Sequence, residues 1–268
     1  MPKTRKSYGI ALCRFNAQNI PEIILIKKRY TYYFFEFVLG KYQKNDDKYL
    51  SKIFNNMTYQ EKMDILNLKF DDLWYKIWLE IPNQSHYRRK SLYPLRIKDS
   101  GFNEKRYTCS YIKSKSKFES NFLSDYGHRL RRLINDSTNS ETIWEIPRGR
   151  KNMNEREVDV AIREFYEETS IDSKKYNILW HIKPINNSYR DDGVIYKTTY
   201  YIAVIDDSAK HWSPKVNFNS YDQILEIEAI KWLSLNEINI LMLNRKTKTR
   251  TVELFKTIIN IFKKQCVP

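Results

Sequence analysis

The chain has 268 residues, of which 41% are hydrophobic and 15% aromatic, so it can bury a core in one large domain or two modest ones. This composition excludes a largely disordered chain. Lys and Arg outnumber Asp and Glu by 47 to 32, which gives a formal net charge of +15. Such a balance favours a polyanionic partner, most often nucleic acid, and a basic solvated surface is the alternative.

The three cysteines, Cys13, Cys109 and Cys266, are scattered and odd in number. They form neither a disulfide framework nor a zinc-binding spacing, so we expect a reducing compartment. The N-terminus, MPKTRKSYGIAL, lacks the apolar stretch of a secretory signal. The most hydrophobic run, YTYYFFEFVLG, is much shorter than the roughly 20 residues that span a bilayer. We therefore expect no membrane span.

The first elements are strands. Residues 7–15 and 21–30 alternate or run apolar and are separated by a turn-like NAQNIP, which predicts a hairpin. Residues 57–82 then show apolar positions at helical spacing, preceded by a capping box of Thr58 and Glu61 and ended by Pro82. We expect a core-packed pair of helices there.

A basic segment follows. Residues 84–134 hold thirteen Lys or Arg against four Asp or Glu, with tyrosines and phenylalanines interleaved. Because basic side chains track phosphates and aromatic rings stack on bases, this segment is a candidate surface for single-stranded nucleic acid. A solvated charged face is the alternative. The candidate contacts are Arg88, Arg89, Lys90, Lys113, Lys115, Lys117, Arg131 and Arg132.

Sequence patterns typical of strands return after the polar linker NDSTNS. We predict strands within 141–149, 191–205 and 224–234, and an amphipathic helix over 251–264 that packs on the sheet. The simplest architecture is an α/β domain made of residues 1–35 and 141–268, split by a largely α-helical basic insertion of residues 36–140.

An acidic helix is expected between the first two of these strands. Residues 155–168 contain six Asp or Glu and two Arg. On a helix, Glu164, Glu167 and Glu168 stand at i, i+3 and i+4, so their carboxylates converge. Two such charges about 4 Å apart repel by about 4 kcal/mol at an effective dielectric of 20. A divalent cation such as Mg²⁺ or Mn²⁺, which prefers oxygen ligands, would relieve this repulsion, whereas a solvated acidic face is the alternative.

The residues that surround this helix carry a family resemblance. Gly149, five residues, Glu155, seven residues and then REFYEETSI resemble the Nudix box, Gx5Ex7REUxEExGU, where U is bulky and apolar. One position departs, because Ser170 stands where the pattern has glycine. The resemblance implies a Nudix α/β/α sandwich and hydrolysis of a nucleoside diphosphate linked to another moiety.

The same resemblance implies roles for individual residues. Glu164, Glu167 and Glu168 would hold Mg²⁺ or Mn²⁺, with the carbonyl of Gly149 as a further ligand. Glu155 and Arg163 would pair to brace the loop against the helix. The flanking cations Arg148, Arg150 and Lys151 would contact the phosphates, or are plain surface charge.

Further segments resemble a subgroup of the family. EIILIKKRY, IFNNMTYQEKM, LWYKIWLEIP and WEIPRGRKN are similar to the mRNA-decapping Nudix enzymes of large DNA viruses, such as African swine fever virus and, more distantly, poxviruses. This implies release of m⁷GDP and 5′-monophosphate RNA from capped mRNA, with the insertion gripping the RNA, in the cytoplasm of an infected cell or packaged in the virion.

Two further expectations come from the decapping enzymes. Their additional glutamate outside the box, at the start of a strand with a Trp, corresponds to Glu226 as general base or metal ligand, with Glu228 as the fallback. The aromatic zone from Tyr30 to Phe35 is a candidate for stacking on the cap, and a buried strand explains it equally well.

Two other functions stay open at this point. One is a Nudix hydrolase of diphosphoinositol polyphosphates or free nucleotides, and the other is a non-catalytic RNA-binding Nudix protein. The intact set of box carboxylates speaks against the second. The sequence leaves open whether the chain forms a homodimer.

Overall fold

The computed structural model describes residues 3–79, 104–191 and 193–265. The chain forms two compact units, one of residues 1–28 with 143–268 and the other of residues 29–142. The first boundary thus falls seven residues before the position expected from the sequence. The reason is that residues 32–38 form a helix in the inserted unit, so the alternative of a buried strand between Tyr30 and Phe35 is wrong.

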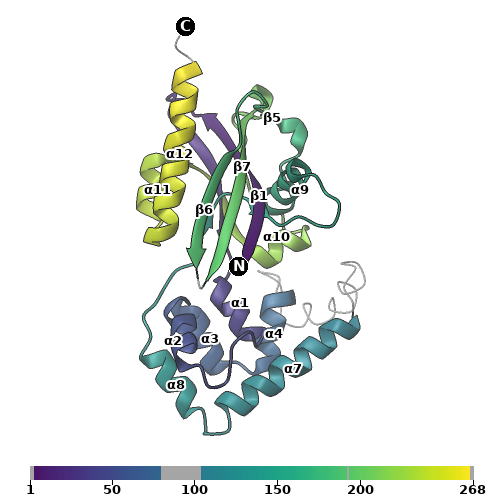
Figure 1. The fold of residues 1–268 in the computed structure, drawn as a ribbon, viewed down its shortest axis with the longest axis vertical. Coiled ribbons are helices and arrows are strands. Elements are labelled where there is room, and N and C mark those ends of the chain that lie inside the picture. The colour runs from purple at the N-terminus through teal and green to yellow at the C-terminus, as the bar shows by residue number, and fades with distance from the viewer. Residues whose placement is uncertain (1–2, 80–103, 192, 266–268) are drawn as a thin grey trace. The chain divides into compact units, whose positions relative to one another are not determined.

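The split unit is built on one mixed sheet (Figure 1). Its strands are β1 (Thr4–Phe15), β2 (Pro21–Lys28), β3 (Trp144–Glu145), β4 (Arg148–Gly149), β5 (Tyr176–Ile178), β6 (Ile185–Asp191), β7 (Val194–Ile205) and β8 (Ile227–Ser234). The central β1 pairs in parallel with β7 and antiparallel with β2 and β4. The strand β2 pairs antiparallel with both β3 and β8. Segments far apart in the sequence therefore meet at β2.

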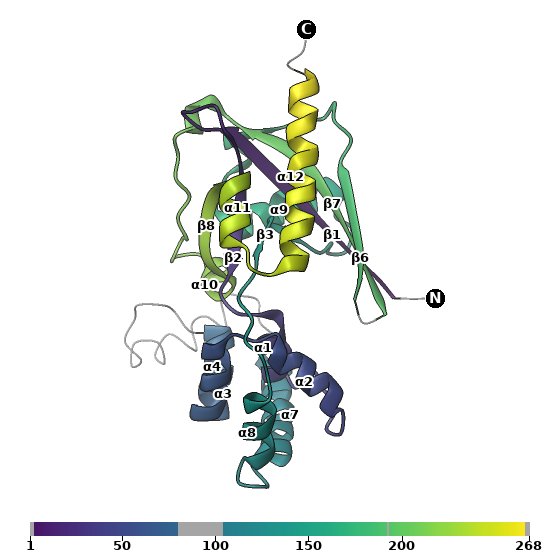
Figure 2. The ribbon, with the colours of Figure 1, turned by 90° about the vertical axis from the view of Figure 1, so that its left-hand side faces the viewer.

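Helices cover both faces of this sheet, as the two views in Figures 1 and 2 show. The helix α9 (Glu157–Thr169) packs on one face, where its apolar side chains join those of β1 and β8 in a single core. The helices α11 (Leu235–Leu241) and α12 (Arg245–Gln265) cover the other face. Alternate residues of β1 enter the two cores, as a strand buried on both sides requires. This is the α/β/α sandwich expected from the sequence.

A short helix differs from the predictions. Residues 224–234 were expected to be one strand, but α10 (Tyr221–Glu226) occupies the first three of them and β8 begins at Ile227. Ile224 and Leu225 are both buried. Because a short apolar run reads alike as a strand and as a buried helical turn, its pattern could not separate the two. Two 3₁₀ turns, Ser173–Lys175 and Asp207–Ala209, complete the unit.

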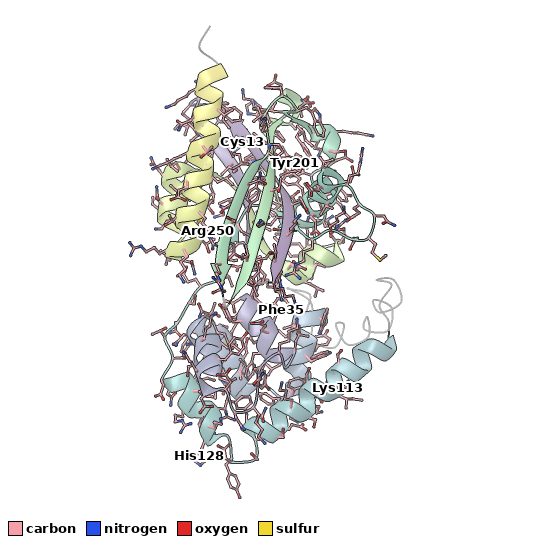
Figure 3. The ribbon with its side chains drawn as sticks, in the orientation of Figure 1. Cys13, Phe35, Lys113, His128, Tyr201 and Arg250 are labelled. Atoms are coloured by element: carbon pink, nitrogen blue, oxygen red, sulfur yellow. The ribbon has the colours of Figure 1, made fainter. Side chains whose placement is uncertain are left out.

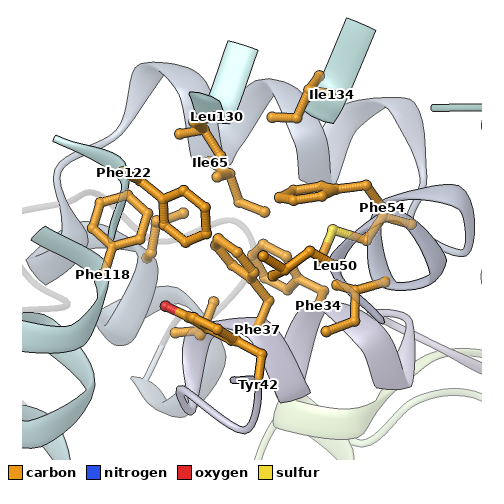
Figure 4. Packing of buried hydrophobic residues seen from close by; sticks show 14 of the residues in the cluster. Phe34, Phe37, Tyr42, Leu50, Phe54, Ile65, Phe118, Phe122, Leu130 and Ile134 are labelled. Atoms are coloured by element: carbon orange, nitrogen blue, oxygen red, sulfur yellow. The ribbon is translucent and has the colours of Figure 1, made fainter. Parts of the chain in front are cut away.

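The inserted unit is helical over the residues that the structure describes. Its helices are α1 (Tyr32–Val38), α2 (Asp47–Asn55), α3 (Tyr59–Asn67), α4 (Phe70–Leu79), α7 (Glu104–Phe122) and α8 (His128–Asn135). The predicted capping box is present, with Thr58 and Glu61 bonded reciprocally at the start of α3. An aromatic core that includes Phe34, Phe37 and Phe122 holds the helices together (Figure 4).

Across the described ranges, no helix is both long enough and apolar enough to cross a membrane.

Candidate active site

The acidic face of α9 is the centre of the site. Val160, Ala161 and Phe165 are fully buried against the sheet, which fixes the rotation of the helix about its axis. Glu164 and Glu168 follow at the edge of this apolar stripe and are themselves partly and almost fully buried. The apolar stripe therefore orients the carboxylates as well as anchoring the helix.

Arg163 braces the acidic face against the loop before it. Its Nε and one terminal nitrogen donate to the two carboxylate oxygens of Glu155, at 2.7 and 3.1 Å. Its other terminal nitrogen donates to Glu164 at 2.9 Å and to Glu167 at 3.0 Å. The guanidinium also donates to the carbonyl of Arg150 at 3.1 Å. One arginine thus reduces the repulsion among three carboxylates and pairs with Glu155 as the resemblance implies.

Gly149 lies where a side chain could not be accommodated. It pairs with Tyr8 at the edge of the sheet, and a Cβ added to it would overlap the carboxylate of Glu164. Burial raises the pKa of Glu164, and the nearby charge of Glu226 raises it further against the opposing effect of Arg163. The glycine of the box is therefore required because the Glu164 carboxylate packs directly against its backbone, and not because the backbone adopts an unusual conformation.

A buried lysine that the sequence analysis did not single out lies among the glutamates. The ammonium of Lys28 is 2.6 Å from Glu168, 2.9 Å from Glu226 and 3.9 Å from Glu145. Lys28 is only 7% exposed. The pairing of β2 with β8 shifts register between Lys27 and Lys28, and such a bulge re-aims the side chains of a strand. Only its place at the end of an apolar strand could have marked it in the sequence.

Glu168 is the most enclosed carboxylate of the box. Burial raises its pKa to about 7, the charge of Lys28 opposes this shift, and Glu145 and Glu226 add to it. Its second oxygen accepts a hydrogen bond from the backbone N–H of Arg148 at 2.9 Å. The Arg148 side chain turns away to Glu145 and Ser7, at 3.0 and 3.2 Å. Arg148 therefore supports the site through its main chain, and its guanidinium is engaged within the protein.

Glu226 and Glu228, the two candidates for the glutamate outside the box, differ in position. Glu226 is the last residue of α10, and its carboxylate shares Lys28 with Glu168. Glu228 lies two residues further on, is exposed, and pairs with the half-buried Lys27 at 2.9 Å. The structure brings Glu226 to the box carboxylates and directs Glu228 elsewhere.

Comparison with known proteins places this geometry in a family. The sequence profile of the NUDIX domain matches residues 130–255. The mRNA-decapping protein g5R of African swine fever virus (isolate Warthog/Namibia/Wart80/1980) is 34% identical over 241 residues, covering 88% of each chain. The chain belongs to the Nudix hydrolase family.

Other similarities to this Nudix chain are weaker. A provisionally named mRNA-decapping protein of Acanthamoeba polyphaga mimivirus is 28% identical over 228 residues, covering 80% of this chain and 58% of its own. A solved Ap4A hydrolase of C. elegans is 12% identical, with a TM-score of 0.42 and coverage of 95% and 97% of the two chains. That structural similarity is too low to bear on the site.

Nudix hydrolases generally need divalent metal ions, and the acidic cluster fits one by its chemistry. Glu164, Glu167 and Glu168 offer hard carboxylate oxygens, the donors that Mg²⁺ and Mn²⁺ prefer. Within the described ranges, no three acidic, His or Cys side chains are grouped closely enough to coordinate one ion. Two internal cations, Arg163 and Lys28, are bound to these carboxylates instead. A divalent ion would thus compete with cations that the protein itself supplies.

The remaining predicted cations of the Nudix unit lie on the loop before α9. Arg150 and Lys151 are both exposed. Their side chains are therefore available to solvent next to the carboxylates, unlike that of Arg148.

The predicted cations of the inserted unit lie on α7, on α8 and in a stretch outside the described residues. Lys115 pairs with Asp71 at 2.7 Å, and Lys117 donates to the backbone carbonyls of Gly40 and Tyr42. Lys113 is exposed on α7 (Figure 3). On α8, Arg131 donates to the carbonyl of Tyr126, and Arg132 is largely exposed, with Asp47 3.7 Å away. Arg88, Arg89 and Lys90 lie outside the described residues.

Proposed function

We propose that this Nudix hydrolase removes the 5′ cap of mRNA, cleaving the cap pyrophosphate to release m⁷GDP and 5′-monophosphate RNA. The observation that carries the proposal is the 34% identity over 88% of both chains with a protein named as mRNA-decapping. A match that spans the insertion as well as the Nudix unit favours a shared substrate over a shared fold alone. We also infer that it acts in the cytoplasm of an infected cell, since the relatives that support decapping are proteins of large DNA viruses.

The residues of the site have separable tasks in this reaction. We assign Glu164, Glu167 and Glu168 to holding Mg²⁺ or Mn²⁺; when bound, the ion would neutralise phosphate charge and lower the pKa of the attacking water. Glu226, at the mouth of the cluster with its side chain 56% exposed, accepts the proton of that water. Arg163 keeps Glu155 and the loop in place. Lys28 limits the repulsion between Glu168 and Glu226.

The experiment uses RNA labelled in the cap, incubated with the full chain and either Mg²⁺ or Mn²⁺. Decapping predicts labelled m⁷GDP as the product and a 5′-monophosphate on the RNA. Labelled m⁷GMP, or no product at all, would contradict the proposal.

The same assay separates the main alternative. Diphosphoinositol polyphosphates and free nucleotides are polyanions that would also suit a basic protein. We expect capped RNA to be turned over with a higher kcat/KM than free cap analogue or a diphosphoinositol polyphosphate. A strong preference for the last would identify a small-molecule hydrolase instead.

A further inference from the structure

The serine that departs from the Nudix pattern occupies a strained position. Ser170 is the C-cap of α9, with φ 55° and ψ 22°, in the left-handed region that glycine adopts without cost. The turn is nevertheless closed, because the backbone N–H of Ser170 donates to the carbonyl of Tyr166 at 2.7 Å. Serine in this conformation carries a cost that an interaction of its side chain can offset.

That interaction is made by a fully buried glutamine. The Nε2 of Gln223 donates to the hydroxyl oxygen of Ser170 at 2.7 Å, and Gln223 is 0% exposed. Its Oε1 accepts a hydrogen bond from the backbone N–H of Asn217, also at 2.7 Å. A buried amide that loses one partner is strongly disfavoured, so glycine at position 170 would leave the Gln223 donor unsatisfied.

The bond joins the two elements that carry the acidic side chains. Ser170 follows Glu168 by two residues at the end of α9, and Gln223 precedes Glu226 by three residues on α10. Gln223 and Glu226 lie on the same short helix, so fixing Gln223 restrains the helical turn that ends at Glu226. The carboxylates of Glu168 and Glu226 meet at Lys28, 2.6 and 2.9 Å from its ammonium.

We propose that the Ser170–Gln223 hydrogen bond is a positioning device that holds α10, and with it Glu226, against the carboxylates of α9. Ser170 and Gln223 are positioning residues that act through Glu226. Serine has a higher conformational cost here than glycine would have, but its hydroxyl forms a hydrogen bond that connects α9 to α10. The inference rests on the proposed function, because Glu226 must act on the substrate for its position to affect turnover.

The first test is a double-mutant cycle on the full chain with Ser170→Gly, Gln223→Met and both together. Each single variant should lower kcat about tenfold with KM within twofold, because binding surfaces are untouched. The kcat of the double variant should be no lower than that of the less active single variant. Losses that multiply, or single variants with wild-type kcat, would overturn the proposal.

A second test asks whether the effect passes through Glu226. In a Glu226→Gln background, Gln223→Met should cause no further loss of kcat, whereas a general structural defect would lower it again by the same factor. The control is Thr199→Val, which removes a hydrogen bond of 2.8 Å to Asn186 on the β6–β7 hairpin and should leave kcat unchanged.

A third measurement separates failure of this proposal from failure of the proposed function. Thermal unfolding of the metal-free variants should show non-additive losses for Ser170→Gly and Gln223→Met, whatever substrate the enzyme prefers. If the wild type cleaves no capped RNA but this coupling is present, the function fails and the link stands. Additive losses of Tm would contradict the proposed Ser170–Gln223 coupling even if decapping is observed. Should Gln223→Met fail to fold, Ser170→Gly decides alone: an increase in Tm from relief of strain would contradict the compensating bond.

Discussion

The ammonium of Lys28 lies 2.6 Å from a carboxylate oxygen of Glu168, although 140 residues separate the two along the chain. Both side chains are almost fully buried. A buried charge is stable only when it is paired, so each of these two residues accounts for the burial of the other.

Lys28→Met should strongly destabilise the metal-free Nudix unit. Removing one partner of a buried pair typically costs about 3–5 kcal/mol, because the other charge stays behind without compensation. We expect thermal unfolding to show a Tm lower by roughly 10 °C. Added Mg²⁺ should restore more stability to Lys28→Met than to the wild type, because a bound cation would compensate the carboxylates that have lost the lysine.

The matched control for that variant is its neighbour. Lys27 pairs with Glu228 at the surface, where both side chains are substantially exposed. Lys27→Met should therefore change the free energy of unfolding by less than about 1 kcal/mol. Equal losses for the two lysine variants would contradict the assignment of Lys28 to the acidic cluster.

Glu167→Gln combined with Glu168→Gln should abolish release of m⁷GDP while leaving RNA affinity intact, because the amides keep the shape and lose the charge that binds a divalent ion. Product chromatography and fluorescence anisotropy measure the two quantities. The control is Asp159→Asn on the same helix, whose carboxylate pairs with the exposed Arg156. Unchanged turnover in the double variant would rule out the metal assignment.

Gly149→Ala should lower kcat about 10²-fold, since a displacement of about 1 Å in a catalytic group has effects of this size. The added methyl group would overlap the Glu164 carboxylate and push it aside. Gly193→Ala is the control: its φ of 74° makes alanine strained, but a Cβ there meets nothing within 4 Å. It should lose stability and keep its kcat, measured in the same cap-release assay.

Cys13 gives a prediction about pH. Burial raises the pKa of its thiol far above the ordinary value of 9.0, so the thiol ionises more readily in the unfolded chain than in the native one. Its stabilising contribution is therefore complete below pH 9 and is lost as pH rises above it. The difference in free energy of unfolding between wild type and Cys13→Val, from urea titrations at pH 7 to 10.5, should change by up to about 1.4 kcal/mol per pH unit in the alkaline part of this range. A difference that is constant with pH would contradict the prediction.

RNA binding by the inserted unit can be tested residue by residue. Lys113→Gln removes an exposed charge from α7, so it should weaken RNA affinity and flatten the logarithmic salt dependence by about 0.7. Lys117→Met should instead destabilise the unit, because its ammonium holds two backbone carbonyls. Glu119→Gln, on the same helix and exposed, is the control that should not weaken binding. If Lys113→Gln leaves both affinity and salt slope unchanged, α7 does not contact the RNA.

The predictions from the sequence succeeded where a feature depends on neighbouring residues. The capping box of Thr58 and Glu61 follows from a short spacing, the pairing of Glu155 with Arg163 was implied by the resemblance to the Nudix box, and both are present. The boundary at residue 28 and the helical residues 224–226 were missed, because short apolar runs fit a strand and a helical turn equally well.

The sequence by itself determined the Nudix box and the placement of its glutamates on one side of a helix, because i, i+3 and i+4 spacing on one helix depends only on local geometry. Only the tertiary structure decided which other groups surround them. Lys28 reaches Glu168 through the bulged pairing of β2 with β8, and Gln223 reaches Ser170 because α10 packs against the end of α9. Such contacts join segments separated by 53 and 140 residues. They arise from sheet register and core packing, which no short stretch of sequence encodes.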